Sequence, residues 1–271
     1  LPISDMASEP LAQRFPRPSV MGVLNVTPDS FSDGGVHFDP AVAAVAARHM
    51  LDAGAAIVDI GGESTRPGSG GVTLVEELRR VEPVLAALEG SPVSIDTSKA
   101  GVARVALRYG AEMVNDITAL RHDPQLAEVV AESDAYLCLM HMQGEPRTMQ
   151  VAPSYTDVVS EVKAFLEERL AFAIDAGIPA ERICLDPGIG FGKTVDHCIE
   201  LLQRLDEIVA IGQPVLVGLS RKSFLGKLLG DPAATQGPLE ASLAGAVAAF
   251  ERGATIFRVH DVQETVAALR V

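Results

Sequence analysis

The sequence predicts a single (β/α)8 barrel, in which eight parallel strands are surrounded by helices. Eight short apolar segments recur along the 271 residues, and each is followed by a loop and then a helical pattern. A strand that is nearly continuous in apolar residues is buried on both faces, which is typical of parallel sheets covered by helices. Eight such units in about 250 residues fit a (β/α)8 barrel. A doubly wound open sheet is the alternative that these patterns leave open.

The predicted elements follow one another from residue 19 to residue 271. The strands cover residues 20–26, 56–62, 93–97, 113–117, 136–141, 183–188, 214–220 and 255–261. Alanine-rich amphipathic stretches between them predict helices that include residues 41–53, 74–88, 102–108, 158–176 and 239–252. Residues 1–18 lack an apolar core of the length that a signal peptide requires, so we expect a loosely ordered N-terminal arm there. Residues 19–271 form the barrel domain.

Polar residues close all eight predicted strands at their C-terminal ends. In a barrel these ends emerge on one face, where the loops build the active site. A single polar strand end is usually a loop cap, but eight in register predict a functional site. They are Asn25, Asp59 with Glu63, Asp96, Asn115 with Asp116, His141, Asp186, Ser220 with Lys222, and Arg258 with His260.

Composition limits the partners and the compartment. The formal net charge of −14 opposes a broad nucleic-acid or anionic-membrane surface. No apolar run approaches the roughly 18 residues that a membrane helix needs. The three cysteines are an odd number without paired spacing, which argues against a disulfide framework. We therefore expect a cytoplasmic protein that acts on small molecules and binds neither nucleic acid nor membrane.

Two glycine-containing motifs come close to known signatures and fail. The segment DPGIGFGKT, residues 186–194, resembles a phosphate-binding loop, but Pro187 stands where the first glycine is required. The segment GLSRK, residues 218–222, has Lys222 where a nucleophile elbow has its second glycine. A better anion site is the pair Arg258 and His260, because residues two apart on a strand share one face.

An ordered set of motifs resembles the dihydropteroate synthase family. The motifs are MGVLNVTPDSFSDGG, DIGGESTRPG, SIDTSK, NDI, LMHMQGEPRTMQ, DPGIGFGKT, GLSRKSFLG and RVHDV. The resemblance implies an enzyme, a transferase that joins p-aminobenzoate to 7,8-dihydropterin-6-ylmethyl diphosphate and releases pyrophosphate in folate biosynthesis. It also implies a homodimer formed through the outer helices and a candidate sulfonamide target. Two alternatives are a pterin-binding methyltransferase that shares the barrel and a non-enzymatic pterin-binding paralogue.

The resemblance also implies the site residues. The pterin ring is expected against Asp96, Asn115, Asp186 and Lys222, whose acceptors and donors complement the polar edge of a pterin. Met140 and Phe191 are candidates for packing on the ring, and core packing explains Met140 equally well. The diphosphate is expected at Arg258 and His260, with Asn25 as an oxygen ligand to Mg²⁺.

Two glycine-rich segments are expected to close over the bound pterin and to form the p-aminobenzoate site, as the resemblance implies. The residues expected there are Phe31, Asp33, Thr65, Pro67 and Ser220. The expected reaction is a dissociative displacement, with catalytic roles for Asp33, Lys222, Arg258 and His260. Because an arylamine is already unprotonated near pH 7, no strong general base is required.

Overall fold

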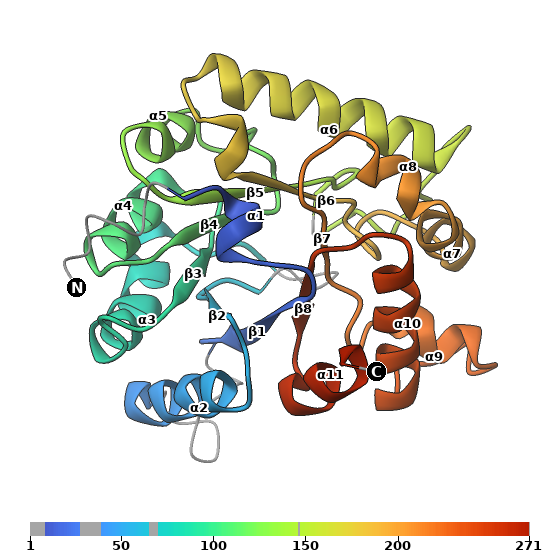
Figure 1. The fold of residues 1–271 in the computed structure, drawn as a ribbon, viewed down its shortest axis with the longest axis horizontal. Coiled ribbons are helices and arrows are strands. Elements are labelled where there is room, and N and C mark those ends of the chain that lie inside the picture. The colour runs from blue at the N-terminus through green and yellow to red at the C-terminus, as the bar shows by residue number, and fades with distance from the viewer. Residues whose placement is uncertain (1–8, 28–38, 65–69, 146, 271) are drawn as a thin grey trace.

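The barrel is seen in a computed structural model that describes residues 9–27, 39–64, 70–145 and 147–270 (Figure 1). Within these ranges all strand pairs are parallel. The strands are β1 (Ser19–Asn25), β2 (Ile57–Gly61), β3 (Val93–Asp96), β4 (Met113–Asp116), β5 (Tyr136–Met140), β6 (Ile183–Asp186), β7 (Leu216–Val217) and β8 (Ile256–Val259). Each lies within a segment predicted from the sequence, apart from one residue at the start of β1.

The eight strands form one sheet, paired in the order β6-β5-β4-β3-β2-β1-β8-β7. The sheet curls so that β6 and β7 meet at a bridge between Leu185 and Val215. The Leu185 amide also donates to the carbonyl of Pro214 at 3.0 Å. The (β/α)8 prediction is confirmed, and the doubly wound open sheet is wrong.

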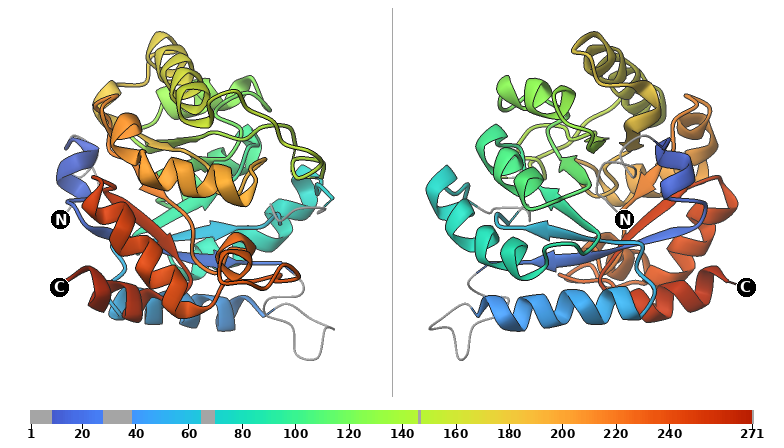
Figure 2. Two further views of the ribbon diagram at one scale, coloured as in Figure 1. Left: turned by 90° about the vertical axis from the view of Figure 1, so that its right-hand side faces the viewer. Right: turned by 60° about the vertical axis from the view of Figure 1, so that its left-hand side comes forward.

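Helices form an outer layer around the strands, as the two side views show (Figure 2). Side chains cap the N-termini of several helices. Asp39 accepts a hydrogen bond from the amide of Ala41 at 2.8 Å at the start of α2, and Asp157 accepts one from the amide of Ser160 at 2.7 Å at the start of α6. The helices are α1 (Leu11–Arg14), α2 (Pro40–Asp52), α3 (Leu74–Ala87), α4 (Ala100–Arg108), α5 (Gln125–Ala131), α6 (Val158–Asp175), α7 (Val195–Gln203), α8 (Leu205–Val209), α9 (Ser223–Leu228), α10 (Leu239–Glu251) and α11 (Val262–Leu269).

The N-terminal end of the barrel is closed by α1. The expectation of a loosely ordered arm is wrong for residues 9–18, because Leu11 and Phe15 are fully buried. They pack with interior residues at the beginnings of the strands, including Tyr136 of β5 and Ile256 of β8. The rings of Phe15 and Tyr136 meet edge to face, with centroids 5.6 Å apart. Residues 1–8 lie outside the described part of the chain.

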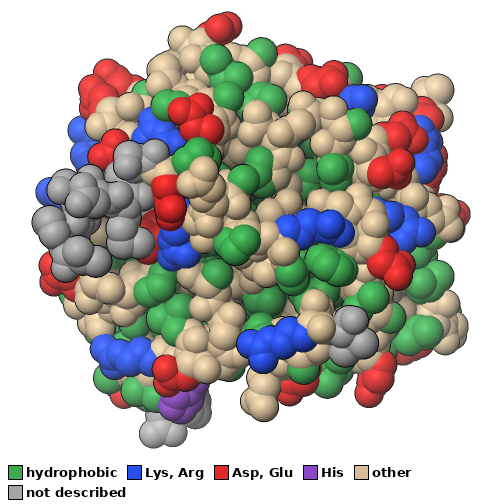
Figure 3. All heavy atoms as spheres, in the orientation of Figure 1, with side chains coloured by type: hydrophobic (Ala, Val, Ile, Leu, Met, Phe, Trp, Pro, Cys, Tyr) green, Lys and Arg blue, Asp and Glu red, His purple; other side chains and the backbone are tan. Residues whose placement is uncertain are grey.

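Acidic and basic side chains are interspersed over the face shown in Figure 3. In the described part of the chain, no helix combines the length and the apolar character that crossing a membrane requires. All three cysteines are free and buried. Several buried ionisable side chains, among them Asp96, Asp116 and Asp186, lie at the C-terminal ends of the strands.

Candidate active site

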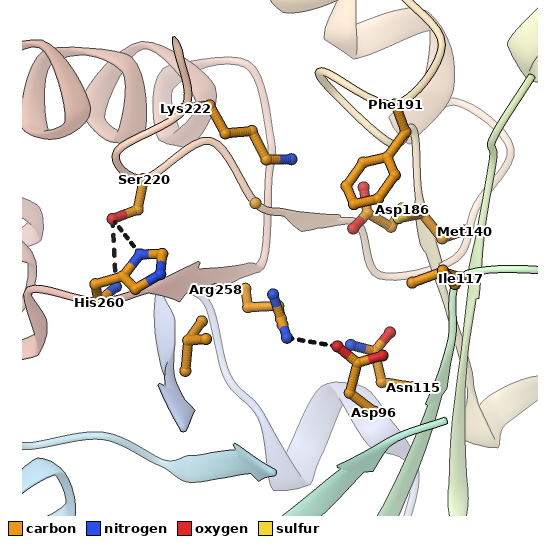
Figure 4. Close-up of a pocket in the computed structure, with 12 residues that line it drawn as sticks. Asp96, Asn115, Ile117, Met140, Asp186, Phe191, Ser220, Lys222, Arg258 and His260 are labelled. Carbon is orange, nitrogen blue, oxygen red and sulfur yellow. Dashed lines mark hydrogen bonds and ion pairs between the residues drawn. The ribbon is translucent and has the colours of Figure 1, made fainter. Parts of the chain in front are cut away.

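A cavity at the C-terminal ends of the strands collects nine of the predicted site residues (Figure 4). Its volume is about 40 Å³, which is room for roughly one water molecule. A bicyclic ring can enter only if long side chains that line the cavity move. The lining residues are Val23, Asp96, Asn115, Ile117, Met140, Asp186, Phe191, Gly218, Ser220, Lys222, Arg258 and His260.

Arg258 joins two carboxylates, Asp59 in the middle of β2 and Asp96 at the end of β3. Its Nε donates to Asp59 Oδ2 at 2.7 Å, and its Nη2 donates to Asp96 Oδ2 at 2.8 Å. Asn115 donates to the same Asp59 oxygen at 2.9 Å. Asp59 is fully buried, and its second oxygen, Oδ1, has no hydrogen-bond partner among the described residues. The network therefore crosses the barrel from β8 to β2, β3 and β4.

Burial and charge shift the pKa values in this network in opposite directions. Burial raises the pKa of Asp96 to about 7, although the neighbouring Arg258 guanidinium opposes the shift. The negative charge of Asp59 adds to the rise. Burial works against the charge of Arg258, but Asp59 and Asp96 together raise its pKa above the usual value. Arg258 therefore stays charged, while Asp96 changes its protonation near neutral pH.

A second polar pair lies across the cavity, on β6 and in the segment after β7. Asp186 Oδ1 accepts from the amide of Gly188 at 2.7 Å, and burial raises the pKa of this carboxyl. Burial lowers the pKa of Lys222 to about 8, with Asp186 opposing the shift. Lys222 Nζ donates to the carbonyl of Ile189 and lies 4.6 Å from the centroid of the Phe191 ring.

The remaining wall of the cavity is apolar. Met140 packs in a buried cluster with Met142 and Met149, against which Ile117 and Phe191 lie. In Figure 4 the Phe191 ring lies beside Asp186, with Met140 and Ile117 on the same side of the cavity. A flat ring placed here would meet sulfur and aromatic surface on its faces and carboxylate and amide groups at its edge.

The structure separates the two residues of the predicted anion clamp. Both project from one face of β8 and its end, but Arg258 points to Asp96 whereas His260 points to Ser220 (Figure 4). The His260 amide donates to Ser220 Oγ at 3.2 Å, and its ring Nδ1 lies 3.3 Å from the same oxygen. Both side chains line the cavity, but they do not surround one common point. Two other strands, β2 and β3, supply the carboxylates that draw Arg258 inward.

Asn25 ends β1 and is half-buried, outside the set of residues that line the cavity. Its carboxamide makes no hydrogen bond with the described residues. Among the described residues, no group of three His, Cys, Asp or Glu side chains could hold a metal ion. An amide oxygen suits Mg²⁺, which commonly takes few protein ligands and completes its shell with phosphate and water. The residues present therefore fit an Mg²⁺ ion that is carried partly by a phosphate ligand.

The chain resembles known proteins over nearly its whole length. Residues 21–260 match the family described as pterin binding enzyme. Dihydropteroate synthase of Escherichia coli K12 is 50% identical over 260 residues, which cover 94% of this chain and 90% of the relative. The chain belongs to the dihydropteroate synthase family of pterin-binding enzymes.

Solved structures of the family agree with this assignment. Dihydropteroate synthase of Xanthomonas albilineans with 4-aminobenzoic acid has a TM-score of 0.85 and 45% identity, over 94% of this chain and 92% of that one. The Burkholderia cenocepacia enzyme complexed with 7,8-dihydropteroate has a TM-score of 0.82 and 47% identity, over 94% and 90%. Membership of this family makes the chain a transferase.

The role of Asp59 was not predicted from the sequence, and four predicted site residues lie outside the described part of the chain. Asp59 was recognised as a strand end but was given no role, although it holds both Arg258 and Asn115. A charge inside the apolar run AIVDIGG could have revealed it, because a buried carboxylate requires partners. The predicted residues of the two glycine-rich segments lie outside the described residues: Phe31, Asp33, Thr65 and Pro67.

Proposed function

We propose that this chain condenses 7,8-dihydropterin-6-ylmethyl diphosphate with p-aminobenzoate to give 7,8-dihydropteroate and pyrophosphate. The observation that carries the proposal is the cavity itself, where carboxylate, amide and cationic groups from separate strands surround an apolar wall. The family relationship supports the same reaction, and relatives have been solved with 4-aminobenzoic acid and with 7,8-dihydropteroate.

The groups that line the cavity complement a pterin in polarity. The ring N–H and amino groups of a pterin require acceptors, which Asp186 and Asn115 offer beside the apolar surface of Phe191 and Met140. A ring carbonyl and ring nitrogens require donors, and Lys222 supplies N–H groups at the cavity edge. To admit the ring, Lys222 gives up its bond to Ile189, or Arg258 turns away from Asp96.

The reaction that follows is a dissociative displacement. The bond between the pterin methylene carbon and the diphosphate oxygen breaks, the electron pair leaves with the diphosphate, and the electron-rich dihydropterin stabilises the cation. The neutral arylamine nitrogen then attacks the methylene carbon and releases its proton to solvent. Arg258 and His260 stabilise the negative charge that grows on the leaving group. Asp33 belongs to the same proposal, at a position outside the described residues.

Mg²⁺ belongs to this proposal as the partner of the diphosphate. The ion supplies positive charge that offsets the charge of the leaving group. Asn25 would hold it through a neutral amide oxygen, which adds no negative charge near a diphosphate. The residue thereby orients the diphosphate at the mouth, next to the end of β1.

A cytoplasmic homodimer completes the proposal. Three buried free thiols suit a reducing compartment. Leu228 and Leu229 are 53% and 66% exposed at the end of α9, and burial of such a pair would favour self-association through the outer helices. Light scattering coupled to gel filtration should give twice the chain mass, and Leu229→Glu should reduce it to one.

One assay tests the proposed reaction. Purified protein should release pyrophosphate from the pterin diphosphate only when p-aminobenzoate and Mg²⁺ are both present, and mass spectrometry should detect dihydropteroate. Pterin binding without pyrophosphate release would contradict the proposal and favour the methyltransferase or the non-enzymatic paralogue. Asp134→Ala, at an exposed position before β5, is a control that should retain full activity.

A further inference from the structure

The segment between β6 and α7 carries Phe191 into the cavity, and its backbone needs outside support. It lies tightly against the end of β5: a Cβ on Gly188 would stand 1.8 Å from the carbonyl oxygen of His141. Alternate residues also have positive φ, which glycine adopts without the strain that other residues incur. These are Gly188 at 64°, Gly190 at 88° and Gly192 at 62°.

Four consecutive carbonyl groups of this segment each accept a hydrogen bond from a side chain. Three of the donors, Lys222, Gln150 and Tyr155, lie outside the segment, and the fourth, Lys193, belongs to it, so the segment is fixed by side chains and not by a regular backbone ladder of its own. The pairs are Lys222 Nζ to Ile189, Gln150 Nε2 to Gly190 at 2.5 Å, Lys193 Nζ to Phe191 at 3.0 Å, and Tyr155 Oη to Gly192 at 2.8 Å.

Two of the four donors, Gln150 and Tyr155, belong to the connection between β5 and α6. The Tyr155 ring packs against His141 and His197, with centroid separations of 6.1 and 5.0 Å. This packing holds the hydroxyl group toward Gly192. The described residues of the β5–α6 connection therefore reach the segment between β6 and α7 without lining the cavity.

Lys193 links the segment to the residue that follows β5, His141. It is 3% exposed, and its Nζ lies 2.8 Å from His141 Nδ1 and donates to the Phe191 carbonyl. Burial lowers the pKa of Lys193 to about 7, and burial followed by the charges of Lys193 and Arg121 lowers that of His141 to about 2. A neutral His141 can accept the bond, and either form of the lysine has enough N–H groups for both partners.

We propose that Tyr155 and Lys193 are positioning residues for pterin recognition, because they hold the carbonyls of Gly192 and Phe191 and so set the place of the Phe191 ring. The inference rests on the proposed function. The same segment begins at Asp186, whose carboxylate accepts from the Gly188 amide at 2.7 Å. Its geometry therefore governs one polar and one apolar contact to the ring.

The donors matter most when the pocket is filled. The cavity is too small for a pterin unless a lining side chain moves, and Lys222 is one of the two long cationic side chains there. If Lys222 turns to the ring, Ile189 loses its donor and the other three donors must hold the segment. Tyr155 and Lys193 therefore affect pterin binding without touching the ligand.

The test compares Tyr155→Phe with the wild type by calorimetric titration of 6-hydroxymethylpterin. Loss of one neutral hydrogen bond is worth about 0.5–1.5 kcal/mol, and because the bond also exists without ligand this sets an upper limit of about tenfold on the weakening of binding. The KM for p-aminobenzoate at saturating pterin diphosphate should stay unchanged. Tyr109→Phe is the matched control, because its hydroxyl group donates to Glu82 on the exterior and its loss should leave pterin binding unchanged.

A double-mutant cycle distinguishes positioning from a general effect on the fold. In a Phe191→Leu background, Tyr155→Phe should cost less pterin affinity than it does in the wild type, because the ring that it positions is gone. Lys193→Met, which keeps the aliphatic stem, should weaken pterin binding in the same way. Thermal unfolding of each sample shows whether the variant is folded at the temperature of the titration.

The possible outcomes are separable. Pterin affinity unchanged in both Tyr155→Phe and Lys193→Met would overturn the inference, as would full additivity in the cycle. Loss of affinity with coupling to Phe191 would support it. Failure of the wild type to bind the pterin would overturn the proposed function instead.

Discussion

Arg258 and Asp96 form an ion pair across the floor of the cavity, with Nη2 and Oδ2 2.8 Å apart. The arginine expected to hold a diphosphate is therefore also the counter-charge of two carboxylates, since Asp59 lies 2.7 Å from its Nε. A diphosphate at this arginine competes with protein carboxylates for the same N–H groups. The leaving-group site and the ring site thus share one residue.

Replacement of Arg258 by alanine should destabilise the protein as well as impair the reaction. It leaves Asp59 and Asp96 buried without their cation, and loss of one member of a buried pair costs about 3–5 kcal/mol. Urea denaturation measures the change, and affinity for a pterin without diphosphate should fall too. Arg79→Ala is the control, because its pair with Glu76 is exposed and contributes little. Equal stability of the two variants would contradict the buried network.

Asp96 should make stability depend on pH in a defined direction. Its pKa is raised to about 7, so the folded state holds this proton more tightly than the unfolded state. The stabilisation is complete below the unfolded pKa near 4 and is lost as pH rises toward 7, by at most about 1.4 kcal/mol per pH unit. Asp96→Asn should remove this component, so wild type should lose stability relative to the variant over that range. Parallel profiles in urea denaturation would show that Asp96 keeps an ordinary pKa.

Asp186→Ala should weaken pterin binding by roughly 2–4 kcal/mol, because a buried charged hydrogen bond is lost and its partners are left unpaired. Calorimetric titration with 6-hydroxymethylpterin measures the loss, and circular dichroism confirms the fold. Asp134→Ala should bind like wild type, since Asp134 is exposed. An unchanged affinity in Asp186→Ala would remove this residue from the ring site.

Asn25→Ala should lower activity in a way that added Mg²⁺ partly restores. One of the few protein ligands is lost, so a higher concentration of the ion is needed for the same occupancy. Steady-state rates measured across a Mg²⁺ series test this, with Arg258→Ala as the comparison that extra Mg²⁺ should not restore. If excess Mg²⁺ leaves Asn25→Ala unimproved, Asn25 does not hold the metal.

Phe15→Ala should destabilise the barrel by about 3–5 kcal/mol, because a fully buried ring is removed from the closed N-terminal end. Affinity for the pterin should be nearly unchanged, since the cavity lies at the opposite ends of the strands. Phe172→Ala is the matched control at a ring that is 42% exposed, and it should cost much less. A loss no larger than that of Phe172→Ala would show that α1 does not close the barrel.

The sequence predicted those parts of the site that local pattern determines. Asp96, Asn115 and Asp186 each end an apolar run, and parallel strands bring such ends to one face. The direction of Arg258 was not predictable in this way, because it depends on Asp59 and Asp96 from two other strands. The alternation of side chains along a strand correctly predicted that Arg258 and His260 share one face. It did not predict that Arg258 binds Asp96 whereas His260 binds Ser220.

The closed end of the barrel escaped prediction for a related reason. Leu11 and Phe15 are an isolated apolar pair in a polar stretch, and a helix as short as α1 has almost no periodic signal. Leu11 and Phe15 are buried against residues at the N-terminal ends of several strands, and these residues come together only after the barrel has closed. The support of the Phe191 segment by Gln150 and Tyr155 is equally non-local, since each donor is about 40 residues from its acceptor.

The pairing of β1 with β8 also bears on the order in which the molecule is made. At a synthesis rate of about 5–20 residues per second, the ribosome completes β8 roughly 10–50 s after β1. During this interval β1 can pair with β2 once that strand has been made, but its other neighbour is missing, and Leu11 and Phe15 have no contact with Ile256. Such long sequence separations slow folding. A chain that has formed the pair of β1 with β2 would therefore carry an unpaired strand edge until β8 has been synthesised.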